Sequence, residues 1–185
     1  MADRPAARLP PTPGRILRGE PLRTPFQVVL IEPEIPQNTG NIARLCAATS
    51  SSLHLCGKLG FRIDEHAVRR AGLDYWPLVD LHVHESFAAF ERDLSPRVWL
   101  LSAHATRSYT DVAFVPGDAL VFGKESVGLP RELLDRAEPR VLGIPTLGPV
   151  RSLNLANAVA IALFEALRQQ GVLGHVHVSE APADP

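Results

Sequence analysis

The sequence contains few cysteine, methionine and aromatic residues. Its 185 residues include 2 cysteines, 1 methionine and 6% aromatic residues. Two thiols, Cys46 and Cys56, are too few for the disulfide framework of a small secreted domain, and nothing beside them suggests a zinc site. This scarcity predicts a protein of a reducing compartment that holds no metal.

Long apolar runs are missing as well. The most apolar stretch, 156–167, contains Asn157 and Glu165 and is shorter than the roughly 20 apolar residues of a membrane-spanning helix. No apolar core follows the basic residues near the N-terminus, so no signal peptide is indicated. Hydrophobic residues make up 45% and charged residues 21%, as in a folded domain. We expect a soluble, cytoplasmic protein with neither a membrane nor DNA as a partner.

Neither sign of charge dominates the chain as a whole, since the formal net charge is −1 at pH 7. The distribution is uneven: residues 1–24 carry a net charge of +3 and residues 25–185 a net charge of −4. Lysine is rare, and 17 of the 19 basic residues are arginine. The planar guanidinium suits phosphate and RNA contacts. A GC-rich coding sequence would also enrich arginine, so both explanations stay open.

Proline marks the limits of the folded part. Residues 1–25 contain six prolines among the arginines, and proline fixes φ and removes a backbone donor. This composition predicts a disordered or extended tail over 1–25. We expect one folded domain over 26–170 and a weakly ordered C-terminal tail over 171–185.

Predicted strands and helices alternate within the folded part. We expect strands at 26–31, 53–56, 79–83, 98–101, 120–122 and 141–144. We expect helices from Asn38 or Thr39 to Thr49, at 64–71, at 86–94, shortly after Pro130, and at 153–169. Several of the strands are continuous apolar runs, which is typical of strands buried on both faces. The alternation predicts an α/β fold with a mostly parallel sheet and helices on both faces, whose ligand binds beyond the carboxyl ends of the strands.

Two polar loops follow predicted strands at those ends. The loop at 32–44 places asparagines at the start of a helix, where free backbone N–H groups favour anions, and sets Asn41 and Arg44 on one helical face. The loop at 121–130 encloses Glu125 between two glycines, and a glycine such as Gly123 lets the backbone approach a ligand closely. Each loop alone also fits a plain structural role, as a helix cap or an ordinary β–α turn.

A third loop, 144–159, joins the last predicted strand to the last helix. Its prolines and glycine indicate a turn, and Ser152 fits the N-cap of the helix that follows. Asn154 and Asn157 stand in an otherwise apolar helix, where an unpartnered carboxamide costs about 1–3 kcal/mol. They therefore either satisfy nearby backbone groups or face a site.

Together these loops resemble the three motifs of the SPOUT class of methyltransferases. The matching strings are PEIPQNTGNIARLCAAT at 33–49, FGKESVGLP at 122–130, and IP followed by RSLNLANAVA within 144–160. They are most similar to the small TrmL-type enzymes, the tRNA (cytidine(34)/uridine(34)-2′-O)-methyltransferases. The resemblance extends over about residues 26–170.

The resemblance implies an S-adenosylmethionine-dependent enzyme that methylates the 2′-hydroxyl of the wobble nucleotide in the anticodon loop of tRNA. It also implies a homodimer and a C-terminal segment threaded into a deep trefoil knot. By motif position, the cofactor site is expected to contain Leu101, Gly123, Ile144, Ser152 and Leu153. The catalytic residues are expected to be Arg44, Asn41, Asn154 and Glu125, with Arg44 acting on the 2′-hydroxyl.

The cofactor role leads to one expectation for Gly123. A branched side chain there would occupy the space of the adenosine, so Gly123→Val is expected to abolish cofactor binding and leave the fold intact.

Three alternatives stay open on the sequence. A related SPOUT enzyme would modify ribosomal RNA or another tRNA position, although such relatives often carry an extra RNA-binding domain. A catalytically silent knotted module would bind RNA without the cofactor, which a cofactor-binding measurement would reveal. A generic nucleotide-binding α/β domain has no support from a phosphate loop, because the sequence has neither GxGxxG nor the Walker lysine pattern.

Overall fold

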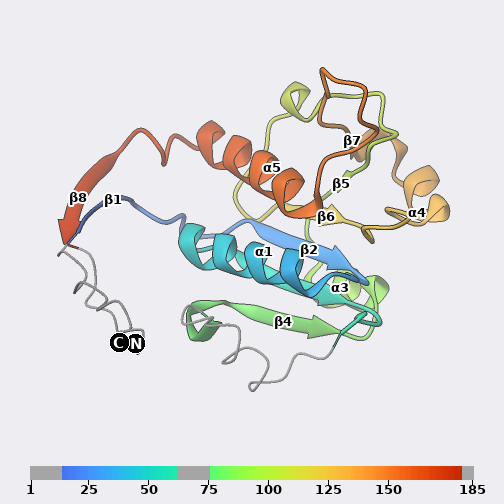
Figure 1. Cartoon of the computed structure of the whole chain (residues 1–185), viewed down its shortest axis with the longest axis horizontal. Helices are drawn as coiled ribbons and strands as arrows, with labels where there is room; N and C mark the ends of the chain where they lie inside the picture. The colour runs from blue at the N-terminus through green and yellow to red at the C-terminus, as the bar shows by residue number, and fades with distance from the viewer. Residues whose placement is uncertain (1–13, 62–75, 181–185) are drawn as a thin grey trace, which may run out of the picture.

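A computed structural model describes residues 14–61 and 76–180, so the helix predicted at 64–71 lies outside the described residues. Six strands form one sheet in the order β4-β3-β2-β6-β5-β7, and every neighbouring pair is parallel (Figure 1). The strands are β2 (Gln27–Ile31), β3 (Ser52–Cys56), β4 (Leu81–His84), β5 (Val98–Leu101), β6 (Ala119–Phe122) and β7 (Val141–Leu142). The predicted parallel α/β sheet is confirmed.

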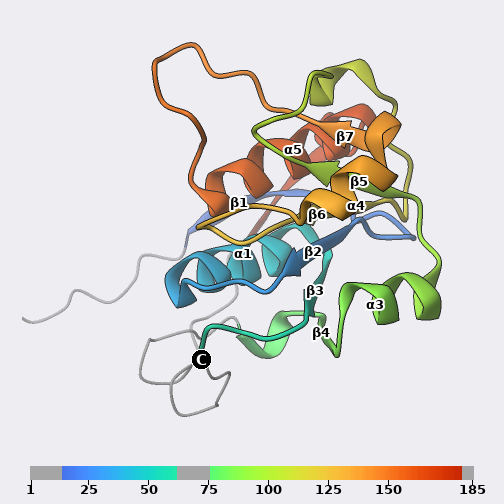
Figure 2. The same ribbon diagram turned by 90° about the vertical axis from the view of Figure 1, so that its right-hand side faces the viewer.

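Helices cover both faces of this sheet, as Figure 2 shows from a second direction. On one face, α1 (Pro36–Thr49) and α5 (Leu155–Gln169) pack on β2 and β6 in a core that includes Ile42 and Leu163. On the other face, α3 (Phe87–Leu94) and α4 (Arg131–Arg136) enclose a second core around Phe90. Short 3₁₀ turns at Trp76–Leu78, Tyr109–Asp111 and Glu138–Arg140 complete the connections. No helix in residues 14–61 and 76–180 is long and apolar enough to cross a membrane.

Four predicted element limits are wrong by two residues or more. Strand β4 begins at Leu81, two residues later than expected. Helix α1 begins at Pro36, before Asn38 and Thr39, because proline at the first helical position needs no hydrogen-bond acceptor for its nitrogen. Helix α5 begins at Leu155, and its N-cap is Asn154 rather than Ser152. Strand β7 ends at Leu142, two residues earlier than expected.

The predicted tails also need a correction. Residues Arg15–Gly19 (β1) and Val176–Glu180 (β8) form a two-stranded antiparallel sheet, with Leu17 opposite Val178. These parts of the expected tails, 1–25 and 171–185, are therefore paired strands. The sequence pattern did not reveal the pairing because its two strands lie at opposite ends of the chain, with no hairpin turn between them.

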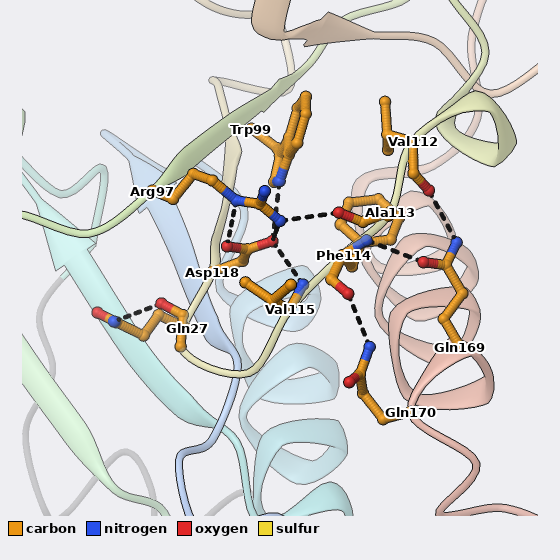
Figure 3. A network of polar contacts seen from close by, with 11 residues as sticks. Gln27, Arg97, Trp99, Val112, Ala113, Phe114, Val115, Asp118, Gln169 and Gln170 are labelled. Carbon is orange, nitrogen blue, oxygen red and sulfur yellow. Dashed lines mark hydrogen bonds and ion pairs between the residues drawn. The ribbon is translucent and has the colours of Figure 1, made fainter.

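A network of hydrogen bonds stabilises the amino ends of strands β5 and β6 (Figure 3). Asp118 lies directly before β6 and is 1% exposed. Its Oδ1 accepts a hydrogen bond from Arg97 Nε at 2.7 Å, and its Oδ2 accepts from Arg97 Nη2 at 2.6 Å, Trp99 Nε1 at 2.9 Å and the Val115 N–H at 2.9 Å. Gln169, the last residue of α5, and Gln170, its C-cap, hydrogen-bond the backbone at 112–114. This network stabilises the edge of the sheet opposite the carboxyl ends of the strands.

Replacing Asp118 with alanine should lower the free energy of unfolding by about 2–4 kcal/mol. The change leaves the buried Trp99 Nε1–H unpaired, at a cost of about 1–3 kcal/mol, and removes the acceptor of the part-buried Val115 N–H, whereas the partly exposed Arg97 regains water. Urea unfolding would measure the loss. The control is Asp135→Ala, which removes a surface ion pair with Arg131 and should cost less than about 1 kcal/mol. Equal losses in both variants would contradict a buried role for Asp118.

Candidate functional site

The three polar loops meet where β2 and β6 lie side by side at the centre of the sheet. After β2 the chain turns into α1, and after β6 it turns into the loop that leads to α4. In a parallel sheet, a point where the connections of neighbouring strands diverge is the usual place for a ligand. The fold therefore places the first and second loops at the position where a site is expected.

Glu125 of the second loop sits against the N-terminus of α1. Its Oε2 accepts a hydrogen bond from the Glu34 N–H at 2.8 Å, and its Oε1 accepts from the Ile35 N–H at 3.3 Å. Helix α1 has no side-chain cap of its own, so this carboxylate supplies an acceptor at the positive end of the helix. Glu125 thus positions the first loop, and its role as a catalytic residue stays a prediction.

Asn38 connects the second loop to the third. Its Nδ2 donates to Glu125 Oε1 at 2.9 Å, and its Oδ1 accepts from Asn154 Nδ2 at 3.0 Å. Asn154 in turn caps α5, because its Oδ1 accepts from the Ala156 N–H at 2.9 Å and the Asn157 N–H at 3.4 Å. A single chain of hydrogen bonds therefore joins all three loops, and both amide ends of Asn154 are satisfied.

The second loop is itself a tight turn. Lys124 and Gly128 exchange backbone hydrogen bonds of 3.2 and 2.9 Å, which closes the loop directly after β6. A Cβ on Gly123 would lie 2.2 Å from the carbonyl carbon of Gly128, so the chain has no room for a side chain there. The Ser126 side chain and N–H lower the pKa of Glu34 and so tie the first loop to the turn. Glycine at position 123 is required first of all by the protein's own backbone.

The predicted catalytic residues occupy different surroundings. Glu125 and Asn154 belong to the hydrogen-bond chain, whereas Asn41 and Arg44 are exposed on α1. The sequence reasoning selected Asn41 and overlooked Asn38, which is buried and contacts both other loops. The helical pattern held a signal for Asn38, because it lies four positions before the buried Ile42 and so on the inner face of α1.

The predicted cofactor residues lie at or beyond the carboxyl ends of neighbouring strands. Leu101 ends β5, Gly123 follows β6, and Ile144 follows β7. Ile144 lines a hollow of about 270 Å³ with Ala103, Ala105, Thr106, Arg107, Gly143, Pro145 and Thr146. Ser152 and Leu153 lie further along the third loop, exposed and half-buried respectively. The hollow is slightly smaller than the roughly 300–1,000 Å³ of most ligand sites.

Histidines gather elsewhere, on the sheet face beside α3. His54 stacks on His82 with ring centroids 4.8 Å apart, and its Nδ1 lies 3.0 Å from His84 Nε2. Burial and the neighbouring imidazoles lower the pKa of His54 to about 4. Within the described part of the chain, no group of three or more histidine, cysteine or acidic residues is placed to hold a metal ion.

Residues 25–164 match the family described as the SpoU rRNA Methylase family. The chain belongs to this family. The matched range contains the hydrogen-bond chain of Glu125, Asn38 and Asn154 and omits both strands of the β1–β8 sheet.

Individual relatives agree with this membership. The chain is 47% identical over 152 residues to a tRNA (cytidine(34)-2′-O)-methyltransferase of Acidovorax sp. (strain JS42), covering 80% of this chain and 94% of the relative. A solved structure described as giving insight into 2-OH methylation of C/U34 on tRNA is 50% identical, with a TM-score of 0.74 over 80% of this chain and 97% of that one. The SpoU methyltransferase AviRb of Streptomyces viridochromogenes, solved with AdoMet, is 26% identical with a TM-score of 0.65, covering 81% of this chain and 62% of that one.

Proposed function

We propose that this protein transfers the methyl group of S-adenosylmethionine to the ribose 2′-hydroxyl of the wobble nucleotide of tRNA, cytidine 34 or uridine 34. The observation that carries the proposal is the hydrogen-bond chain Glu125–Asn38–Asn154, which draws the three family loops to one edge of the sheet. The relative of 47% identity, matched over 94% of its length, bears the name of this activity.

The residues at this edge suit the proposed cofactor. Adenine is a flat apolar ring that needs apolar walls and backbone hydrogen-bonding groups. Ala103, Ala105 and Ile144 supply apolar walls in the hollow, and the loops that bear Gly123 and Ser152 lie on either side of the hydrogen-bond chain. When bound, S-adenosylmethionine supplies an electrophilic methyl group. Leu101, Gly123, Ile144, Ser152 and Leu153 would hold it.

The protein's own part in the reaction is to align the 2′-hydroxyl and to help it lose its proton. Arg44 is exposed on the helix that follows the first loop. A guanidinium stays charged in proteins, which makes it a poor general base. We propose that Arg44 binds a neighbouring phosphate and stabilises the developing alkoxide, while water or that phosphate takes the proton. The hydrogen-bond chain of Glu125, Asn38 and Asn154 holds the three loops together. Asn41 lies about one helical turn before Arg44.

Three features of the proposal go with membership of the SPOUT class. The 143–154 connection between β7 and α5 would be threaded as a deep trefoil knot, and tRNA as the substrate would place the protein in the cytoplasm.

The protein would act as a homodimer, since Ile161 and Phe164 remain exposed on α5 although its opposite face is buried. Sedimentation at micromolar concentration should give the dimer mass, and a monomer would remove this feature.

The activity is tested by mapping 2′-O-methyl groups on the RNA of a strain that lacks the protein. We expect the wobble ribose of at least one tRNA to lose its methyl group and to regain it with the wild-type chain. Complementation with an Arg44→Ala variant should fail. Unchanged wobble methylation, with a methyl group missing instead from ribosomal RNA or another tRNA position, would replace the proposed substrate with one of those alternatives.

A further inference from the structure

Glu32 has a backbone conformation that glutamate rarely adopts. It directly follows β2, and its φ is +47°. Residues other than glycine seldom take a positive φ, because the Cβ then crowds the backbone, and asparagine accepts it far more readily than glutamate does. Among the described residues other than glycine, only Ser50 and Ser95 share this feature, and each ends a helix in the left-handed conformation. Glu32 lies outside any helix, so its strain needs a different explanation.

In this conformation the Glu32 carboxylate reaches the second loop. Its Oε2 lies 2.5 Å from Lys124 Nζ, and this hydrogen bond raises the pKa of the Lys124 ammonium, which keeps it charged. The Glu32 N–H donates to the Cys56 carbonyl at 2.8 Å. Gly57 leaves space for the side chain, because a Cβ there would lie 2.8 Å from Glu32 Cγ. The strained residue is thus held between the loops that follow β3 and β6.

Glu32 is the first of three carboxylates that link the first loop to the second. Glu34 Oε2 accepts a hydrogen bond from the Ser126 N–H at 3.1 Å, and Glu125 accepts from two backbone N–H groups of the first loop. Lys124 directly precedes Glu125, at the point where the loop leaves β6. An ammonium held by Glu32 therefore fixes the start of the turn that carries Glu125.

We propose that Glu32 is a positioning residue for methyl transfer, whose carboxylate holds Lys124 and thereby keeps the second loop in the orientation that transfer requires. This role rests on the function proposed above. A strained residue beside a site indicates that its side chain serves a purpose for which stability is given up. Asparagine would fit the backbone at position 32 better but is too short to take the place of glutamate at Lys124. Stability and activity should therefore not fall together when Glu32 is replaced.

Glu32→Asn separates these two quantities. The melting temperature should stay unchanged or rise by up to about 4 °C, because asparagine accepts a positive φ and the partly exposed ion pair contributes little. The single-turnover rate of methyl transfer at saturating tRNA should fall about tenfold, with an unchanged half-saturating tRNA concentration, because the second loop is misplaced. The matched control is Ser95→Asn, which changes another positive-φ residue at the end of α3 and should keep the wild-type rate. A wild-type rate for Glu32→Asn, or a rate loss accompanied by a lower melting temperature, would overturn the proposal.

Lys124→Met tests whether Glu32 acts through the ammonium. This variant should lose about as much rate as Glu32→Asn. The double variant should lose no more than either single variant, because both changes remove the same ion pair. Rate losses that multiply in the double variant would show that the two residues act separately and would contradict the proposal.

Hydrogen exchange gives a readout that does not depend on methyl transfer. The N–H groups of Lys124 and Gly128 donate to each other's carbonyl at 3.2 and 2.9 Å. In Glu32→Asn both amides should exchange about threefold faster or more, because the turn opens more often. The Gln27 N–H, bonded to the Asp118 carbonyl at the opposite edge of the sheet, should exchange as in the wild type.

Unchanged exchange at Lys124 and Gly128 would mean that Glu32 does not hold the second loop, and the proposal would fail. A wild-type chain that transfers no methyl group to tRNA would instead remove the proposed function. The exchange measurement would still decide whether Glu32 holds this loop, so the two failures are distinguishable.

Discussion

Replacing Arg44 with alanine is expected to lower the rate of methyl transfer to tRNA by about a hundredfold or more. That is the usual loss when a group aimed at transition-state charge is removed. The side chain is exposed on α1, where it can reach RNA, and its removal should leave the fold and the cofactor affinity unchanged. Single-turnover transfer at saturating tRNA measures the chemical step, and calorimetry with S-adenosylmethionine provides the control for cofactor binding.

A lysine at position 44 separates two roles for this arginine. If a positive charge stabilises the developing alkoxide, Arg44→Lys should keep part of the activity, because the charge remains although the bidentate hydrogen bonding of the guanidinium is lost. If Arg44 acts as the base, the lysine variant should instead keep activity that rises with pH, because an ammonium loses its proton more readily than a guanidinium. Arg92→Ala, an exposed arginine on α3, is a matched control that should keep the wild-type rate. A near-normal rate for Arg44→Ala would remove this residue from the mechanism.

Replacing Gly123 with alanine is expected to lower the melting temperature by about 2–12 °C and to abolish cofactor binding. A Cβ at this position lies 2.2 Å from the Gly128 carbonyl carbon and 2.3 Å from the Leu129 nitrogen, so the turn after β6 must move. Such overpacking lowers the free energy of unfolding by about 1–3 kcal/mol. In a chain of this size, each kcal/mol lost lowers the melting temperature by about 2–4 °C. The displaced turn would carry Glu125 away from Asn38 and the start of α1.

This expected loss of stability differs from the expectation based on the sequence, which was that even the larger change Gly123→Val leaves the fold intact and only blocks the cofactor site. The matched control is Gly148→Ala in the third loop, because a Cβ added at Gly148 would have no atom within 4 Å. Differential scanning calorimetry on both variants decides the matter. A Gly123→Ala protein that melts with the wild type and still fails to bind cofactor would restore the original interpretation.

Local patterns in the sequence were sufficient for the scaffold. Apolar runs such as 98–101 became buried strands, and Ser86 caps α3 by accepting a hydrogen bond from the Ala89 N–H at 3.1 Å. Strands and helix caps depend on residues close together in the sequence, so the periodicity and composition of a short segment predict them directly. The three motifs were also visible, because each is a short string placed after a strand.

Contacts between distant residues were decided by the tertiary structure alone. Asn38 meets Glu125 across 87 positions and Asn154 across 116 positions, so the helical pattern could place it on the inner face of α1 but could not show that it joins the loops. The constraint on Gly123 comes from a turn that closes back on it, and the β1–β8 sheet joins the two ends of the chain. The sequence determined which segments form strands, helices and family loops, because those depend on short-range patterns. Folding determined which side chains meet, because that depends on how the sheet order brings remote segments together.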